Sequence, residues 1–185
     1  MFAITERLLL RPGWAEDAPA LAEAIAHEAI AYKLAKLPWP YNVDDAAWFL
    51  GLDRKATDAN FLMFTRTMGK PRLIGGIGLH DQDGEMEIGY WIGPSFWGLG
   101  FATEAGRAVV DIARHTLKLP RLVSGHFTDN PASGHVLRKL GFKPNGRTEL
   151  RHCLARGEDR PCALYDLDLA EAPLVRPDLP IPMAA

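Results

Sequence analysis

The apolar and polar residues of the chain follow two different periods, and these separate predicted strands from predicted helices. Runs of aliphatic and aromatic residues bounded by Gly, Pro or Asp are typical of strands. They cover residues 5–11, 60–67, 72–80, 85–93, 121–129, 148–156 and 160–169. The turn sequences MGKP and DQDG separate the second, third and fourth runs. We therefore expect an antiparallel meander in the middle of the chain and a final hairpin that turns at residues 157–159.

A helical period marks four other segments, two of them in the first third of the chain. The alanine-rich stretch over residues 18–31 is predicted to form the first helix. Asn42 is a suitable N-cap for a second helix over residues 43–58. Asp44 and Asp45 would lie in the first turn of this helix, where the helix dipole favours acidic side chains.

The clearest helical pattern covers residues 101–119, and Pro120 ends it. Charged residues share one face of this predicted helix, and apolar residues share the other. The apolar face consists of Phe101, Ala105, Ala108, Val109, Ile112, Thr116 and Leu119. A short helix over residues 131–140 is predicted after the next strand, with Asn130 as its cap and Gly141 just past its end.

Composition and charge restrict the class of protein. Of the 185 residues 48% are apolar, and 21 Lys and Arg against 23 Asp and Glu give a formal net charge of −2. Such a chain can bury a core without disulfides, and it lacks the basic excess of a nucleic-acid-binding protein. No apolar run approaches the roughly 20 residues of a membrane span, and no secretory signal pattern is present. We expect a cytoplasmic protein with one domain over residues 1–172 and a proline-rich tail over residues 173–185.

The most informative stretch is a glycine-bearing loop between a predicted strand and the longest predicted helix, YWIGPSFWGLGFATEA at residues 90–105. Such a loop leaves backbone amides unpaired at the positive end of the helix dipole, which favours an anion, most naturally phosphate. Gly98 and Gly100 would let the backbone approach the ligand, although a tight turn needs them equally. The dinucleotide fingerprint and the P-loop both fit poorly, because Thr103 replaces a required small residue and no Gly-Lys-Ser/Thr triplet occurs.

Two segments carry a family resemblance. WGLGFATEA (residues 97–105) and NPASGHVLRKLGF (residues 130–142) resemble the signature segments of the GNAT superfamily of acyl-CoA-dependent N-acetyltransferases. TERLLLRP and EIGYWIG (residues 87–93) are similar to the branch with the RimJ and RimL ribosomal-protein N-terminal acetyltransferases. The resemblance extends over residues 5–169. It implies an α/β (α+β) fold with a mixed, mostly antiparallel sheet of about seven strands, about four flanking helices, and a cleft where the fourth and fifth strands splay apart.

The resemblance also implies that acetyl-CoA is the cosubstrate. The loop would hold its pyrophosphate, and the backbone of residues 91–92 would pair with the pantetheine arm, which inserts like a missing strand. Trp97 stands where the family commonly has Arg or Gln, and Leu99 replaces a common basic residue. Coenzyme A is therefore expected either to be held less tightly than usual or to be held by Arg107 or Arg138 instead. The expected cofactor-binding residues are Trp91, Ile92, Trp97, Gly98, Leu99, Gly100, Phe101, Ala102, Thr103, Asn130, Ser133 and Arg138.

The acid that protonates the leaving thiolate is also assigned from the resemblance. Many relatives use a Tyr on the helix after the Asn, but this chain has Leu137 there. The RimL-like branch places a Ser three residues after the Asn, which corresponds to Ser133. Asn130 would contact the pantetheine arm in addition to capping its helix.

The base has several candidates, because the attacking amine must be neutral. Glu87 stands where relatives often place a carboxylate, at the entrance of the splayed strand, and it is the favoured base. Glu85 shares its face of the strand. Glu149, His80 and a chain of water molecules could also take the proton. The oxyanion would be stabilised by a strand amide, such as that of Ile92.

The sequence thus predicts an enzyme that transfers an acetyl group from acetyl-CoA to a primary amine by direct attack in a ternary complex. A protein N-terminal α-amine is the favoured acceptor; the chain could instead be a small-molecule amine acetyltransferase or a non-catalytic acyl-CoA-binding regulatory module. No spacing of His and Cys indicates a metal site, and Cys153 and Cys162 are predicted to be free thiols in a sheet. No contact with nucleic acid or membrane is expected, and both a monomer and a homodimer remain open.

Overall fold

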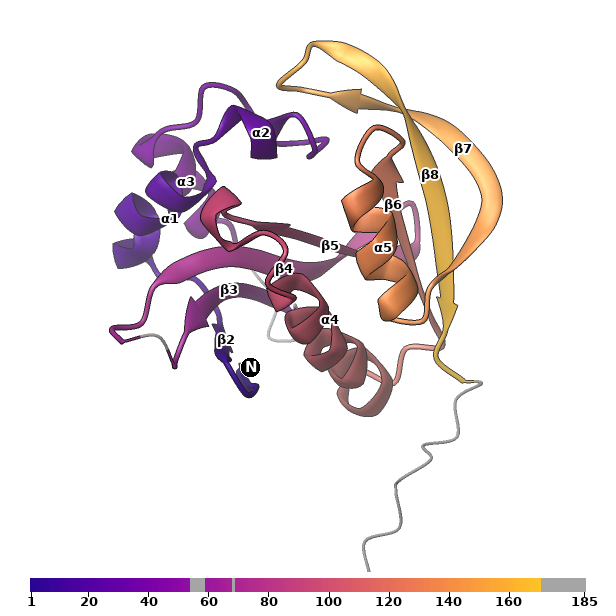
Figure 1. Cartoon of the computed structure of the whole chain (residues 1–185), viewed down its shortest axis with the longest axis horizontal. Helices are drawn as coiled ribbons and strands as arrows, with labels where there is room; N and C mark the ends of the chain where they lie inside the picture. The colour runs from indigo at the N-terminus through magenta and orange to yellow at the C-terminus, as the bar shows by residue number, and fades with distance from the viewer. Residues whose placement is uncertain (54–58, 68, 171–185) are drawn as a thin grey trace, which may run out of the picture.

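The chain folds around one eight-stranded sheet, in a computed structural model that describes residues 1–53, 59–67 and 69–170 (Figure 1). The strand order is β1-β2-β3-β4-β5-β6-β8-β7, and every neighbouring pair is antiparallel except β5 and β6. The expected mixed, mostly antiparallel sheet is confirmed. The strands are β1 (Ala3–Ile4), β2 (Leu8–Arg11), β3 (Asn60–Thr65), β4 (Leu73–Gln82), β5 (Glu85–Ile92), β6 (Arg121–Phe127), β7 (Lys143–Cys153) and β8 (Glu158–Asp168).

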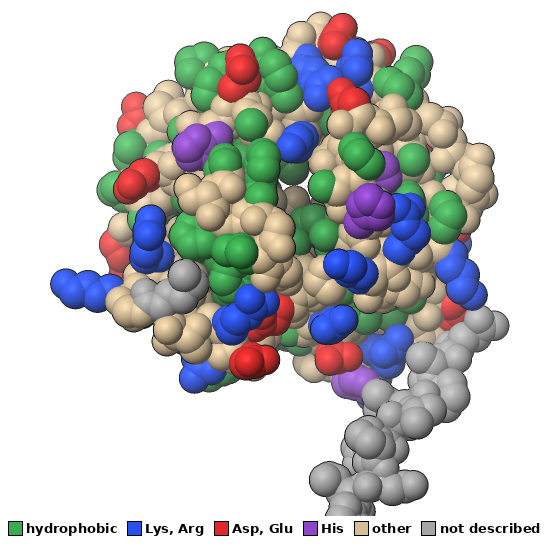
Figure 2. All heavy atoms as spheres, viewed as in Figure 1, with side chains coloured by type: hydrophobic (Ala, Val, Ile, Leu, Met, Phe, Trp, Pro, Cys, Tyr) green, Lys and Arg blue, Asp and Glu red, His purple; other side chains and the backbone are tan. Residues whose placement is uncertain are grey.

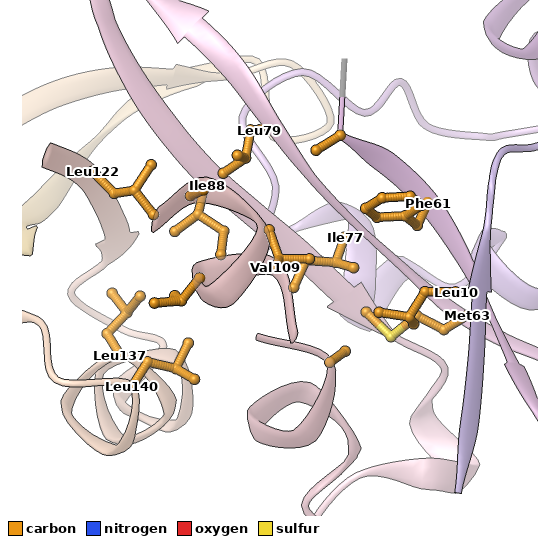
Figure 3. Close-up of a cluster of buried hydrophobic side chains, with 14 of the residues drawn as sticks. Leu10, Phe61, Met63, Ile77, Leu79, Ile88, Val109, Leu122, Leu137 and Leu140 are labelled. Atoms are coloured by element: carbon orange, nitrogen blue, oxygen red, sulfur yellow. The ribbon is translucent and has the colours of Figure 1, made fainter. Parts of the chain in front are cut away.

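Helices cover both faces of the sheet. On one face, α4 and α5 pack on leucine, isoleucine and phenylalanine side chains of β2 to β5, and Figure 3 shows Val109 of α4 among them. On the other face, α1, α2 and α3 form a smaller core with Leu62, Phe64 and Trp91. The helices are α1 (Ala18–Ile25), α2 (Glu28–Ala31), α3 (Val43–Leu50), α4 (Phe101–Asp111) and α5 (Pro131–Lys139), with a π-helical segment at Ile112–Thr116.

The expectation of one continuous helix over residues 18–31 is wrong. The chain leaves the helical region at Ala26, where ψ is 64°, and it begins a second, short helix at Glu28. The cap predicted at Asn42 is confirmed, because its side chain accepts hydrogen bonds from the amides of Asp44 and Asp45. The helix after it is shorter than expected and ends at Leu50; residues 54–58, which the prediction included, lie outside the described residues.

The last turns of the longest helix also differ from the expectation. Residues 112–116 wind as a π-helix, which places more residues in each turn and rotates the following side chains. Thr116, expected on the buried face, is therefore exposed, while Ala113 is fully buried. A strict helical period in the sequence could not indicate this change of winding.

The final hairpin turns earlier than predicted. Cys153 pairs with Glu158, so the turn lies at residues 154–157, and residues 158 and 159 already belong to β8. Both cysteines are free and buried. The same register places Glu149 opposite Cys162, so the two thiols do not face each other directly across the hairpin. The predicted proline-rich tail lies outside the described residues, and no described helix is long and apolar enough to cross a membrane.

An ion pair connects the first long strand to the start of α1. The guanidinium of Arg11 donates to both carboxylate oxygens of Asp17, at 2.7 Å each, and the Trp14 amide donates to Asp17 Oδ2 at 2.8 Å. Asp17 is buried, with 7% of its surface exposed. The hydrogen bond with Arg11 is the main cause of the lowered pKa of Asp17; burial opposes this shift.

We expect Asp17→Asn to lower the free energy of unfolding by about 2 kcal/mol at pH 7, because it removes the charged partner of a buried guanidinium. Since folding lowers the pKa of Asp17, this stabilisation is present above the ordinary aspartate pKa of about 4 and is lost as the pH falls through the folded value. Urea unfolding of wild type and variant should therefore converge in acid. The exposed neighbour Glu16 provides the control Glu16→Gln; equal stability of the Asp17 variant and wild type at pH 7 would contradict the prediction.

Candidate active site

The site begins where two parallel strands separate. β5 and β6 share a single register pair, Glu87 with Val123. The buried hydroxyl of Ser124 donates to the Ile88 carbonyl at 2.9 Å and closes the apex of the gap. Beyond this point the edge of β5 that faces away from β4 has no partner strand.

Two residues of β5 direct their backbone N–H and C=O groups into the gap. The Gly93 amide donates to the Ile74 carbonyl of β4, at 2.8 Å. Because successive residues of a strand direct their backbone groups to alternate sides, Trp91 also faces β4, and Tyr90 and Ile92 face the gap. The pairing expected for residues 91–92 is thus available from Ile92 and Tyr90, while Trp91 contributes its indole ring.

A cleft of about 330 Å³ follows this open edge. Figure 2 shows a hollow near the middle of the face on which α4 and α5 lie, with hydrophobic side chains at its rim. Most of the expected cofactor-binding residues line the cleft. They are Trp91, Ile92, Trp97, Gly98, Gly100, Phe101, Ala102, Thr103, Asn130 and Ser133, joined by Tyr90 and by Ile30, Lys33 and Leu34 of α2 and the residues after it.

The loop after β5 presents backbone amides to one end of the cleft. Gly98 and Gly100 have φ values of 75° and 83°, in the left-handed region that favours glycine. Gly100 is the N-cap of α4, so the amides of the first helical turn, beginning at Phe101, have no acceptor within the helix. These amides and the helix dipole form a site for an anionic group.

Arg7 braces this loop from the N-terminal segment. Its Nη1 donates to the carbonyl of Leu99 at 3.0 Å, and its Nε donates to Glu104 of α4 at 2.7 Å. Burial alone would raise the pKa of Glu104, but hydrogen bonds from Thr5 and Arg7 outweigh it and lower the pKa. Leu99 thus contributes its carbonyl to the frame of the loop, and its side chain is exposed.

Sequence reasoning missed the cation that lies beside the loop. Lys33 Nζ lies 4.0 Å from the ring centroid of Trp97, and the Trp97 indole donates to the Ile92 carbonyl at 2.6 Å. Lys33 therefore occupies the mouth of the cleft next to the position from which the family's usual basic residue is missing. No sequence signal could indicate it, because α2 is far from the loop along the chain.

The arginines expected to compensate are placed elsewhere. Arg138 donates to the Tyr165 hydroxyl at 3.0 Å and does not line the cleft, and Arg107 does not line it either. The polar side chains of α5 that line the cleft are instead those of Ser133, His135 and Lys139.

Asn130 and Ser133 are connected to each other at the start of α5. Asn130 makes no side-chain cap; its Nδ2 donates to Ser133 Oγ at 2.9 Å. Because the Ser133 oxygen accepts this bond, its own hydrogen is available as a donor. The Tyr90 hydroxyl donates to the Ser133 carbonyl at 3.0 Å, and burial raises the pKa of Tyr90 to about 12.

A second pocket, of about 220 Å³, lies on the opposite face of β5. It shares Leu34, Tyr90 and Trp91 with the first cleft. Its floor is made of glycines: a Cβ at Gly76 would lie 2.6 Å from the Trp91 indole nitrogen, and one at Gly78 would overlap the Asn60 side chain. The pocket exists because these positions have no side chains.

The candidate carboxylates Glu85, Glu87 and Glu149 do not line this pocket, and each is paired with an arginine. Glu87 is buried, and its Oε1 accepts from Arg151 Nη1 at 2.7 Å; Arg151 also binds Glu149. Burial alone would lower the pKa of Arg151, but the hydrogen bonds to both carboxylates outweigh it and raise the pKa. Glu85 pairs with Arg121 at 3.2 Å and is exposed. Of the candidate bases, His80 lines the pocket.

Comparison with protein-family models shows to which family the chain belongs. The acetyltransferase (GNAT) domain model matches residues 7–143. The chain belongs to the GNAT acetyltransferase family. Solved structures share the fold: a GNAT-family acetyltransferase from Bacillus anthracis has a TM-score of 0.79 at 24% identity, covering 92% of this chain and all of the other. RimL, the ribosomal L7/L12 α-N-protein acetyltransferase, in complex with coenzyme A, has a TM-score of 0.76 at 20% identity, covering 91% and 98%.

A curated relative of this GNAT protein is the uncharacterized N-acetyltransferase YoaA of Bacillus subtilis. It is 43% identical over 77 residues, which are 40% of this chain and 44% of YoaA. The match thus spans less than half of the relative.

Among the residues that the structure describes, no three His, Cys, Asp or Glu side chains gather as a metal site would require.

We expect Lys33→Met to weaken the binding of coenzyme A about tenfold, because it removes a cation beside the phosphate loop and keeps the aliphatic stem on Trp97. Calorimetry at low and high salt measures the effect, and the difference between the two proteins should shrink as salt screens the charge. Lys143→Met, an exposed substitution on β7, is the control. An unchanged dissociation constant for the Lys33 variant would contradict the prediction.

Proposed function

We propose that this GNAT protein is an N-acetyltransferase that uses acetyl-CoA to acetylate a primary amine, with a protein N-terminal α-amine as its acceptor. The observation that carries the proposal is the meeting of two pockets on opposite faces of β5. One pocket holds the anion-binding loop and the open strand edge, and the other holds the glycine floor. A donor and an acceptor that enter from opposite faces would meet at Tyr90 and Trp91.

Acetyl-CoA fits the first cleft by its chemistry. Its pyrophosphate matches the amides at the start of α4 and the charge of Lys33. Its pantetheine arm carries amide groups, which can pair with the open backbone of Tyr90 and Ile92 as an added strand would. The thioester would then lie toward the apex of the gap, beside Ser133.

The reaction is a direct transfer. The neutral amine nitrogen attacks the thioester carbonyl carbon, a C–N bond forms, and the oxyanion meets a backbone amide of the open edge near the apex. The C–S bond then breaks and its electron pair leaves with sulfur. Ser133, oriented by Asn130, would hydrogen-bond to the departing thiolate, which takes the proton that the attacking nitrogen loses.

The uncharged lining of the second pocket favours an acceptor that has no charged group near its amine. Of the described residues that line it, none is Asp, Glu, Lys or Arg, and most are apolar or glycine. Among the described lining residues, several ammonium groups of a polyamine or aminoglycoside would find no carboxylate partner, and the carboxylate of a free amino acid would find no cation. A protein N-terminus with an uncharged first side chain has neither problem, and its α-amine has an ordinary pKa of about 7.7 to 8.0.

The proposal is tested in two steps. Calorimetry measures the binding of acetyl-CoA, and mass spectrometry then follows acetylation of peptides that begin with Ala, Ser or Met, with spermidine, an aminoglycoside and free amino acids as competitors. We expect the highest kcat/KM with the peptides. Absence of acetyl-CoA binding would overturn the proposal, binding without any transfer would favour a non-catalytic module, and preference for a small amine would reassign the acceptor.

We expect Ser133→Ala to lower kcat about tenfold and leave the KM of acetyl-CoA nearly unchanged. The effect is moderate because a thiolate with an ordinary pKa near 8.5 already leaves readily. Steady-state kinetics measures both constants. Ser95→Ala, an exposed serine near the cleft that does not line it, is the matched control. A wild-type kcat in the Ser133 variant would remove this residue from the mechanism.

We expect Gly78→Ala to lower kcat/KM for the acceptor about tenfold, because the added methyl group displaces Asn60 and raises the floor of the pocket. The KM of acetyl-CoA should stay the same, since the cofactor cleft lies on the other face of β5. A peptide that begins with Gly should lose less than one that begins with Met. An equal loss for both peptides would argue that this pocket does not hold the first residue.

A further inference from the structure

We propose that His80, and not Glu87, is the group that takes the proton from the acceptor amine, and that Glu87 acts on His80 from the neighbouring strand. This inference rests on the proposed function and assigns a residue within that same site.

His80 is placed at the position where the amine would wait. It lies in the second pocket, and its ring covers Gly89: a Cβ at Gly89 would be 3.5 Å from His80 Cε1. Gly89 is flanked by Ile88, whose carbonyl lies at the apex of the gap, and by Tyr90, which lines both pockets. The imidazole therefore lies beside Gly89, next to Tyr90, which lines both pockets.

Glu87 is less suited to meet the amine. It is buried, with 5% of its surface exposed, and does not line the second pocket. Its Oε1 is held by Arg151, so proton transfer to this oxygen would break a buried ion pair. Its Oε2 is also buried and has no hydrogen-bond partner among the described residues. Glu87 is therefore better suited to act on its neighbours through its negative charge than to accept a proton from the substrate.

The register of the sheet couples the two residues. His80 and Glu87 are directly paired between β4 and β5, so their side chains share one face of the sheet. Partial desolvation is the main cause of the lowered pKa of His80. The Glu87 and Asp81 charges oppose this shift, and Lys36 and Arg151 add to it. An imidazole is the side chain that exchanges a proton most readily near neutral pH, which suits His80 to accept one.

The proton balance is complete with groups of the two substrates and this chain. The acceptor arrives as R–NH₃⁺ and gives one proton to His80, which leaves R–NH₂ to attack the thioester. The second proton of the nitrogen neutralises the departing thiolate as the C–S bond breaks. His80 then releases its proton to solvent, so the products are the amide, coenzyme A and one proton.

The test compares His80→Gln, Glu87→Gln and the control His115→Gln, an exposed histidine outside both pockets, in the full chain with a peptide acceptor. We expect His80→Gln to lower kcat about a hundredfold and to remove the acid limb of the pH profile, with acetyl-CoA affinity unchanged. Imidazole should restore activity to His80→Ala. Glu87→Gln should keep most of kcat at pH 8 and shift the acid limb to lower pH, because it removes a charge that raises the pKa of His80.

The opposite pattern would overturn the inference: a wild-type kcat and pH profile in His80→Gln, together with loss of turnover in Glu87→Gln. If Glu87→Gln fails to fold because Arg151 loses one of its two carboxylate partners, the double variant Glu87→Gln/Arg151→Gln removes both charges and is measured in its place. Failure of the wild type to bind acetyl-CoA or to acetylate any amine would instead contradict the proposed function. The two failures are thus distinguishable.

Discussion

The organisation of this protein depends on the separation of β5 and β6 after a single pair, Glu87 with Val123. The other neighbouring strands pair over longer stretches, but β5 keeps one edge open for most of its length. An unpaired strand edge is a costly feature that proteins usually cover. Here α4 and α5 flank the gap without filling it, and an extended molecule with amide groups fits the open edge. This opening is the feature around which the cleft, the phosphate loop and Ser133 are arranged.

Successive side chains of β5 point to opposite faces of the sheet, and each face adjoins a different pocket. Met86, Ile88, Tyr90 and Ile92 face the core beneath α4 and α5, and Glu87, Gly89 and Trp91 face the side of α1 to α3. In the proposed function, backbone groups at the edge of the strand would bind the cofactor, and Gly89 and Trp91 would help to shape the acceptor pocket. Tyr90 and Trp91 line both pockets, so the two substrates would meet at these residues.

Local sequence signals predicted much of this arrangement, and the failures share a physical cause. The meander, the Asn42 cap and the glycine loop before α4 depend on neighbouring residues, so they could be found from patterns. The break at Ala26, the π-helical turn after α4 and the position of Lys33 on Trp97 depend on packing between distant segments, which a single sequence does not display. The same reason explains the arginines: Arg138 was expected to supply a cation to coenzyme A, but its side chain donates to Tyr165 on β8.

If the second pocket holds the acceptor as proposed, its glycine floor affects how such an enzyme can diversify. Gly76, Gly78 and Gly89 belong to β4 and β5, two long strands that are paired along eight residues and are therefore rigid. A mutation of one glycine codon to alanine adds one methyl group to the acceptor side and changes neither the phosphate loop nor the open edge. Descendants of one gene could thus exchange acceptors in small steps while inheriting the donor site intact.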